Sequence, residues 1–417
     1  MGEERRLVRR LGLGQTVAIA LGAMIGAGVY VSMAEAAGTT GGSLVLAVLL
    51  GAAVATLNGL SSAELGAYDP RAGGAYQFGR SLLAPVVGFA AGWLFLLAAL
   101  AAAATYALTF GAYLQPLLPD VPVRVIGLVL VLGAVVVNMV GVRVSARANG
   151  VLVVANLAIL AAFIVLALPA FDANRLQPFL LGDIGGLLQA SALMFFAFTG
   201  YARPVTIAEE VLEPRRTLPR AVPTAIAVTA VLYLGVAFVA LGAMGPEGFG
   251  EASAPLRAVM VAVGSPIGPL LLSLGALLAT SAVLLTEIWG LSRLVFAMSR
   301  NGDLPAWLSC LSERERIPRN AALSIGVLLL VLMIALDLRP LLEASSLALL
   351  VYYGIMSASA LRLPPEHRLY PALVPAAGIV ASALVALSLP WQTLLVVSGV
   401  LIVGLGFYAL RRQRGRE

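Results

Sequence analysis

The sequence predicts an all-α polytopic membrane protein with twelve transmembrane helices. Three observations carry this prediction: the composition, a series of long windows without charge, and the distribution of arginine. Of the 417 residues, 60% are hydrophobic and only 12% are charged, about half the share usual in a soluble domain. At about 20 apolar residues per crossing, twelve crossings would take about 240 residues, close to the whole hydrophobic content. A sizeable soluble domain is therefore excluded.

Charge-free windows mark the candidate helices. They are Leu11–Ala34, Ala36–Ala63, Ser81–Pro119, Val125–Val142, Ala148–Phe171, Ile184–Ala202, Ala221–Pro246, Ala258–Thr286, Asn320–Leu336, Ala344–Leu361 and Leu369–Leu410. The last window is too long for one crossing. We divide it at Leu389-Pro390-Trp391, because proline ends helices and tryptophan favours the membrane interface. The count is therefore twelve.

The arginines indicate the orientation. The chain has no lysine, so all 27 basic residues are arginines. With a cytoplasmic N-terminus, all but six of them fall in inner loops or tails. Four lie outside (Arg124, Arg175, Arg257 and Arg339), and two lie within helices (Arg203 and Arg293). This bias is typical of cytoplasmic loops. It predicts a multi-pass protein of the cytoplasmic membrane with both termini inside, and it explains the net charge of +6 without nucleic acid.

The sequence has few of the residues that catalytic sites and metal sites usually need. One cysteine, Cys310, excludes an internal disulfide framework, and one histidine, His367, disfavours a histidine-based metal site or triad. The carboxylates are scattered along the chain. We therefore expect no enzyme, no metal and no cofactor, and we assign neither residue a role.

Two of the predicted helices are interrupted. Gly22-Ala-Met-Ile-Gly26-Ala-Gly28 breaks the first, and Phe198-Thr-Gly-Tyr-Ala-Arg-Pro204 breaks the sixth. Non-helical backbone at membrane depth is tolerated only beside protein or a cavity. Because an offset of five helices inverts the second unit, the pair predicts an inverted repeat around a midplane site. The alternative is a GxxxG packing face in one helix and a proline kink in the other.

The expected organisation follows from this repeat. Residues 11–171 form a first unit of five helices, residues 184–361 form the inverted second unit, and residues 369–410 form two appended helices.

Four motifs resemble the amino acid–polyamine–organocation (APC) superfamily of transporters. GAMIGAGVY (22–30) is similar to its broken first helix, and FFAFTGYARPVTIAEEVLEPRRTLPRA (195–221) to its sixth helix and following loop. AELGAYDPRAGGAYQFGR (63–80) and LSRLVFAMSRNGDLP (291–305) match the loop after helix two and the end of helix eight. The resemblance implies the LeuT-type 5+5 fold and transport of amino acids by alternating access. The appended pair would serve as scaffold or dimer contacts, in a monomer or a homodimer.

A free amino acid in a dry pocket needs donors for its carboxylate and acceptors for its ammonium. The backbone amides of Gly26, Ala27 and Gly28 can form an anion-binding nest at the start of a half-helix. Carbonyls of residues 22–25 and 196–199, which include Ala197, can accept from the ammonium.

The side chains expected around this backbone are mostly apolar. They are Ile25, Tyr106, Phe196, Phe198 and Tyr201, with the hydroxyl of Thr199 beside them. This set favours a neutral substrate, and the resemblance implies that Phe196 acts as a gate over it. Each phenylalanine could instead face lipid.

Asn156 occupies the place where many relatives carry a lysine that replaces sodium and couples transport to protons. An amide does not titrate, and no lysine exists elsewhere in the chain. Exchange or facilitated transport is therefore favoured over lysine-coupled proton symport, although Asn156 could also be a plain interhelical hydrogen-bond donor. A sodium-coupled mode would need carbonyls of Gly22 or Ile25 with hydroxyls of Thr280, Ser281 or Thr286. A coupling ion thus stays open.

Arg203 and Glu287 are charges inside predicted helices. A charge at a helix centre costs about 2.5–3.5 kcal/mol on insertion scales, so neither should face lipid. Many relatives are acidic at the position of Ala202. Glu287 could replace that carboxylate as a proton carrier or as the partner of an amine or polyamine substrate. Alternatively, Arg203 or Arg293 pairs with Glu287 and neutralises it.

Glu209 and Glu210 lie at the expected inner mouth with Arg215 and Arg216. The resemblance places them near Arg71 and Arg80, where salt bridges that break and reform would gate the inner side. Solvated loop charges are the alternative.

Overall fold

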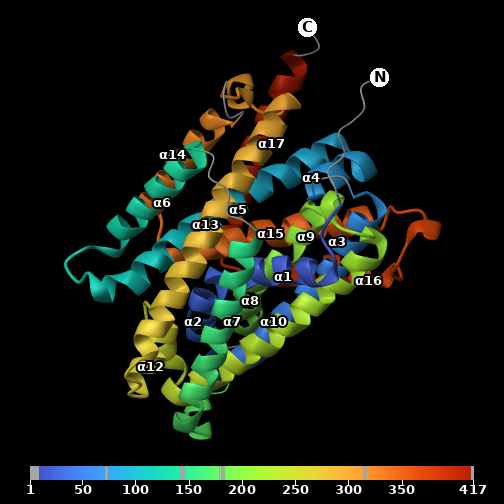
Figure 1. The fold of residues 1–417 in the computed structure, drawn as a ribbon. Helices are drawn as coiled ribbons and strands as arrows, with labels where there is room; N and C mark the ends of the chain where they lie inside the picture. The colour runs from blue at the N-terminus through green and yellow to red at the C-terminus, as the bar shows by residue number, and fades with distance from the viewer. Residues whose placement is uncertain are drawn as a thin grey trace.

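The computed structural model describes residues 9–70, 74–140, 146–177, 179, 184–312 and 317–414. Within these ranges every regular element is a helix, and one isolated backbone bridge joins Leu11 to Val211 (Figure 1). Several of the arginines assigned to the inner side fall outside the described residues: Arg5, Arg6, Arg71, Arg143, Arg314, Arg316 and Arg416.

In the part of the chain that the structure describes, nine helical stretches are long and apolar enough to cross a membrane. They contain α2 (Ala27–Thr40) with α3 (Leu44–Tyr68), α5 (Pro85–Leu114), α6 (Val123–Val140), α7 (Ala146–Ala167), α8 (Ile184–Phe198) with α9 (Arg203–Thr206), α10 (Pro214–Met244), α13 (Gly268–Arg300), α15 (Leu338–Ala360) and α17 (Trp391–Arg414). Three shorter apolar helices are α1 (Leu13–Met24), α14 (Arg319–Ala335) and α16 (Leu373–Leu387). The short helices α4 (Gly74–Phe78), α11 (Pro246–Glu251) and α12 (Pro255–Ala262) lie in connections. The chain is a multi-pass membrane protein.

Both predicted helix interruptions are confirmed. The first lies between the end of α1 at Met24 and the start of α2 at Ala27. In the second, α8 ends at Phe198, a 3₁₀ turn (η6) covers Thr199–Ala202, and α9 follows.

Several expected helix boundaries are wrong: α10 begins at Pro214 and not at Ala221, and α15 begins at Leu338 and not at Ala344. Two other errors share one cause. The first window stops before Glu35, yet α2 continues through it to Thr40, and the eighth stops before Glu287, yet α13 continues through it to Arg300. Each carboxylate has an arginine nearby: Glu35 lies within electrostatic range of Arg339, and Glu287 pairs with Arg203. The helix can continue through a carboxylate whose charge is compensated in this way.

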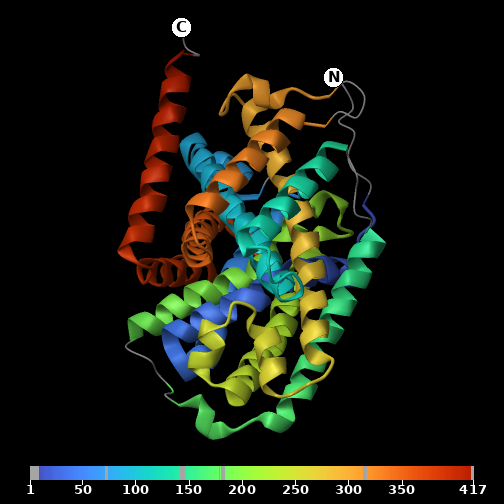
Figure 2. The same cartoon turned by 90° about the vertical axis from the view of Figure 1, so that its left-hand side faces the viewer.

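The long helices run between two ends of the molecule, and α13 covers most of the distance between them (Figure 1). The C-terminal end of α7 and all of α12 lie at the bottom of both views, whereas η8 (Ala306–Ser309) and the C-terminal end of α17 lie at the top (Figures 1 and 2). Segments predicted to share one side of the membrane therefore gather at one end.

The last helix, α17, borders the bundle and is bonded to it at three heights (Figure 2). Thr393 donates to the buried Glu343 of α15 at 2.9 Å, and the indole N–H of Trp93 donates to Val400 O at 2.9 Å. Arg411 donates to Leu304 O beyond the end of α13. This appended helix is thus fixed to α5, α15 and the loop after α13.

The two helix breaks cross at backbone contact. A Cβ atom at Gly28 would lie 2.7 Å from the Cα of Ala197, and one at Gly200 would overlap the carbonyl carbon of Ala23. Each break thus places a glycine against the first half-helix of the other. Only a residue without a side chain permits this approach.

We expect Gly200→Ala to destabilise the protein by about 1–3 kcal/mol, because the new methyl must displace backbone. Thermal unfolding in detergent measures the change. Gly399→Ala in α17 is the matched control, since a Cβ there meets nothing within 4 Å. Equal unfolding temperatures for the two variants would contradict the close crossing.

Candidate functional site

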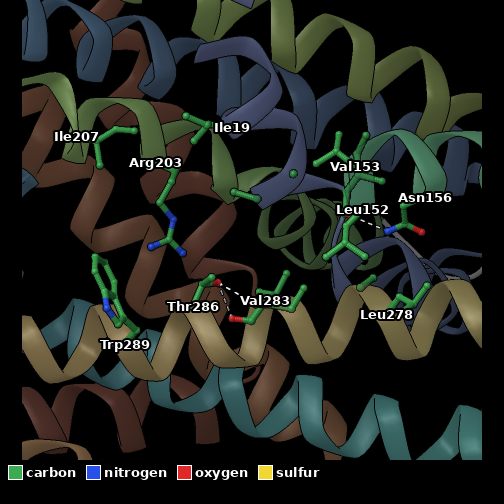
Figure 3. Close-up of a pocket in the computed structure, with 15 residues that line it drawn as sticks. Ile19, Leu152, Val153, Asn156, Arg203, Ile207, Leu278, Val283, Thr286 and Trp289 are labelled. Carbon is green, nitrogen blue, oxygen red and sulfur yellow. Dashed lines mark hydrogen bonds between the residues drawn. The ribbon is translucent and has the colours of Figure 1, made fainter. Parts of the chain in front are cut away.

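Two adjoining cavities lie beside the crossing. The larger, about 290 Å³, is bounded by α1, α7, α9 and α13 (Figure 3). The smaller, about 80 Å³, is bounded by α5, α8 with η6, α13 and α15. They share Ala23, Arg203 and Val283. The crossing helices therefore carry a site with two lobes.

Tyr233 of α10 serves both breaks. Its hydroxyl donates to Met24 O at 2.6 Å and lies 3.3 Å from Ala197 O. One side chain thus holds a carbonyl freed from α1 next to one from α8. A buried carbonyl without a donor would be costly at this depth.

Other side chains supply donors to the second break. The hydroxyl of Tyr353 in α15 donates to Thr199 O at 3.0 Å. Thr199 in turn donates to Phe196 O at 2.8 Å. Among the carbonyls expected to receive an ammonium, those of Phe196, Ala197 and Thr199 thus already have protein donors.

Asn156 bridges α7 to the first broken helix. Its amide nitrogen donates to Ile25 O at 2.9 Å, and its oxygen accepts from the hydroxyl of Tyr30 at 2.5 Å. The side chain lines the larger cavity (Figure 3). Where the resemblance would place a lysine, the chain therefore has a neutral side chain that is both donor and acceptor.

The predicted aromatic residues separate into two groups. Phe196 and Tyr106 line the smaller cavity with ring centroids 6.1 Å apart, and Thr199 lines it too. Phe198 and Tyr201 are fully buried and line neither cavity, because their rings pack on Tyr233 and Tyr353 at 5.2 and 5.0 Å. Ile25 lines the larger cavity.

The predicted anion-binding nest is covered in this conformation. A Cβ at Gly26 would lie 2.7 Å from Cγ2 of Val283, and Gly28 lies against Ala197. The first amides of α2, which begins at Ala27, lack partners within the helix. Gly26 and Gly28 are both buried and line neither cavity.

Arg203 and Glu287 form an ion pair at the boundary between the cavities. Arg203 Nη2 lies 2.9 Å from Glu287 Oε2, with 32% and 13% of the two side chains exposed. Arg203 lines both cavities, and Glu287 lines the smaller. Arg293, the other candidate partner, instead lies over the ring of Trp289 at 3.6 Å. The pairing neutralises Glu287, which the amine hypothesis required to be unpaired.

The inner acidic residues lie in a 3₁₀ turn, Ala208–Glu210. The carbonyl of Glu210 accepts from the amides of Arg10 and Leu11 at 2.8 and 3.0 Å, so this turn holds the chain entering α1.

The basic residues expected near that turn have other contacts. Arg216 pairs with the exposed Glu213 at 3.3 Å, and Arg80 donates to the buried Asp303 at 2.8 Å. A gate that includes Glu209 and Glu210 stays a prediction.

Sequence reasoning missed Tyr233, Tyr353 and Val283. Tyrosines inside apolar helices signal a buried hydroxyl that needs a partner. Nothing in the local sequence says which carbonyl that partner is, and nothing singles out Val283.

The family model described as amino acid permease matches residues 15–415. An uncharacterized transporter of Mycobacterium tuberculosis is 37% identical over 408 residues, covering 97% of this chain and 92% of that protein. The branched-chain amino acid permease BcaP of Bacillus subtilis is 26% identical over 435 residues, covering 98% and 94%. A mitochondrial cationic amino acid transporter of Arabidopsis thaliana is 28% identical over 400 residues, covering 87% and 64%. The family and these relatives are transporters.

We expect Tyr233→Phe to lower stability by about 1–3 kcal/mol, because it removes the donor shared by the two breaks. The unfolding temperature of purified protein measures it. Tyr408→Phe is the control, since it keeps the ring that stacks on Phe89. A loss no larger than that of the control would argue against the bridging role of Tyr233.

Proposed function

Because the chain belongs to the amino acid permease family, within the APC superfamily, we propose that it carries neutral amino acids across the cytoplasmic membrane by alternating access. The observation that carries the proposal is the pair of mostly apolar cavities at the crossing of the two broken helices, between which the charges of Arg203 and Glu287 compensate each other. Such a cavity offers no net charge to attract a cationic or anionic side chain.

The proposed architecture has twelve crossings, in a 5+5 inverted repeat with two appended helices. α1 with α2 forms the first crossing, α8 with η6 and α9 forms the sixth, and α16 and α17 form the last two. The arginine distribution supports cytoplasmic termini. We propose a monomer or a homodimer.

The proposed substrate site lies at the breaks. The amides that begin α2, at Gly26–Gly28, receive the carboxylate. Carbonyls between Phe196 and Thr199 receive the ammonium. Ile25, Phe196 and Tyr106 surround the side chain. The name of the branched-chain relative agrees with an apolar substrate. The name of the cationic amino acid transporter instead points to a positively charged substrate, for which these cavities offer no unpaired carboxylate among the residues that line them.

We propose exchange or facilitated transport as the mode. The neutral bridge formed by Asn156 supports a cycle without a titrating group at that position. Sodium coupling is the rival. Thr280, Ser281 and Thr286 all donate to carbonyls of their own helix, and Thr286 alone of the three lines the same cavity as Ile25. This arrangement gives sodium little convergent coordination.

Counterflow tests this function. Proteoliposomes loaded with one unlabelled neutral amino acid should accumulate the labelled form from outside. Accumulation should persist when choline replaces sodium and when a protonophore is present, because no ion gradient drives exchange. Accumulation of labelled putrescine or agmatine alone would refute the neutral substrate, and a strict sodium requirement would refute the mode.

Asn156→Asp should make transport depend on pH. Only the protonated form of a carboxyl group at this position can donate to Ile25 O. Exchange in the variant should therefore fall as the pH rises, whereas the parent protein stays nearly flat because an amide does not titrate. The initial rate with equal pH on both sides measures this. A flat profile in the variant would count against the bridge.

A further inference from the structure

The ion pair has a position that a purely structural pair would not need. Arg203 lies where η6 meets α9, and its guanidinium extends across the larger cavity toward Thr286 and Trp289 (Figure 3). Its partner Glu287 faces the smaller cavity with Tyr106 and Tyr353, whose hydroxyls lie within electrostatic range of both charges. A ligand at the boundary between the two cavities would therefore lie beside both charged groups.

The charge balance restricts which ligand can engage them. The pair is neutral as it stands, and an approaching carboxylate or ammonium alone would displace one member and leave the other uncompensated. A zwitterion brings both charges. Each protein group can then exchange its partner for one from the ligand, and the net charge of the site stays zero.

We propose that Arg203 and Glu287 form a zwitterion subsite, in which the substrate carboxylate binds the guanidinium and the substrate ammonium binds the carboxylate. This inference rests on the proposed transport of amino acids and adds a second binding position. The guanidinium has five donors in a planar fork, so it suits a carboxylate better than a lysine would.

The subsite lies on the η8 side of the helix breaks. From Arg203 the larger cavity continues to Ile207 of the segment after α9 and to Trp289 of α13 (Figure 3). Arg203 lines both cavities whereas Gly26 and Gly28 line neither, so this conformation exposes the guanidinium and not the nest. The subsite would hold substrate between the backbone site and this end of the molecule.

The cavity wall defines the rest of the substrate. Apart from Arg203, Asn156 and Thr286, the side chains that line it are apolar or aromatic, with Ile25, Leu152, Ile207 and Trp289 among the larger ones. We infer that the ligand is an α-amino acid with an uncharged, apolar side chain. Amines, monocarboxylates and amino acids with a third charge are excluded.

Charge-deletion variants test the subsite. The ligands are the apolar amino acid that gives the largest counterflow and its two single-charge analogues, which for leucine are 4-methylpentanoate and 3-methylbutylamine. Glu287→Gln leaves a guanidinium without a partner and should bind the carboxylate analogue at least about tenfold more tightly than the parent does. Arg203→Gln should gain affinity for the amine analogue to a similar extent. Ligand-induced shifts in unfolding temperature, titrated with each compound, measure these affinities.

Asp337→Asn is the matched control, since it breaks an exposed ion pair with Arg124 that lines neither cavity. It should keep the preference of the parent protein. A merely structural role predicts that both glutamine variants lose amino acid binding and gain neither analogue, and that result would overturn the proposal. Unchanged preference in both variants would overturn it as well.

Conservative variants keep the test decisive if a glutamine variant fails to fold. Arg203→Lys and Glu287→Asp retain both charges but change their reach, so they should weaken amino acid binding at least about tenfold with little change in the unliganded unfolding temperature. Binding equal to that of the parent would refute the subsite. The proposed function fails separately, if the parent protein shows no amino acid counterflow at all.

Discussion

The rest of the structure depends on the contact between two interrupted helices. At Gly28 and Gly200 each break meets the backbone of the other, and this approach requires the absence of a side chain. The interruption leaves carbonyls without helical donors in a region where water is scarce. The bundle therefore has to supply donors from outside the broken helices. The cavities and the ion pair lie where these demands are met.

Three different helices supply the missing donors, each with one neutral side chain. Asn156 comes from α7, Tyr233 from α10 and Tyr353 from α15, and all reach backbone oxygens at the breaks. Positive charge at the crossing is likewise matched locally, by Glu287 against Arg203. The site is thus polar but carries no net charge. Any motion that separates the broken helices from the surrounding bundle must break these hydrogen bonds or move their donors too. The free energy of such a motion therefore depends on these bonds.

Local signals predicted the breaks well, because glycine and proline act on the backbone where they stand. The helix boundaries predicted at Glu35 and Glu287 are wrong, because the arginines that compensate these carboxylates lie on other helices and only packing brings them near. The same limit applies within the site. Ile25, Phe196 and Tyr106 line its cavities as expected, yet the sequence could not tell that Phe198 and Tyr201 are packed away, nor choose between Arg203 and Arg293 as the partner of Glu287. Those outcomes depend on helix rotation, which composition does not encode.

The attachment of α17 has a consequence for biosynthesis. The indole N–H of Trp93 bonds to the carbonyl of Val400, 307 residues later in the chain. At about 5–20 residues per second, the ribosome takes roughly 15 to 60 seconds to make that stretch. Throughout this interval α5 has been inserted without its final neighbour, and Glu343 also awaits the hydroxyl of Thr393. Assembly is therefore complete only when the last helix has entered the bilayer. A chain that ends before α17 leaves the indole N–H of Trp93 and Oε2 of Glu343 without these two partners.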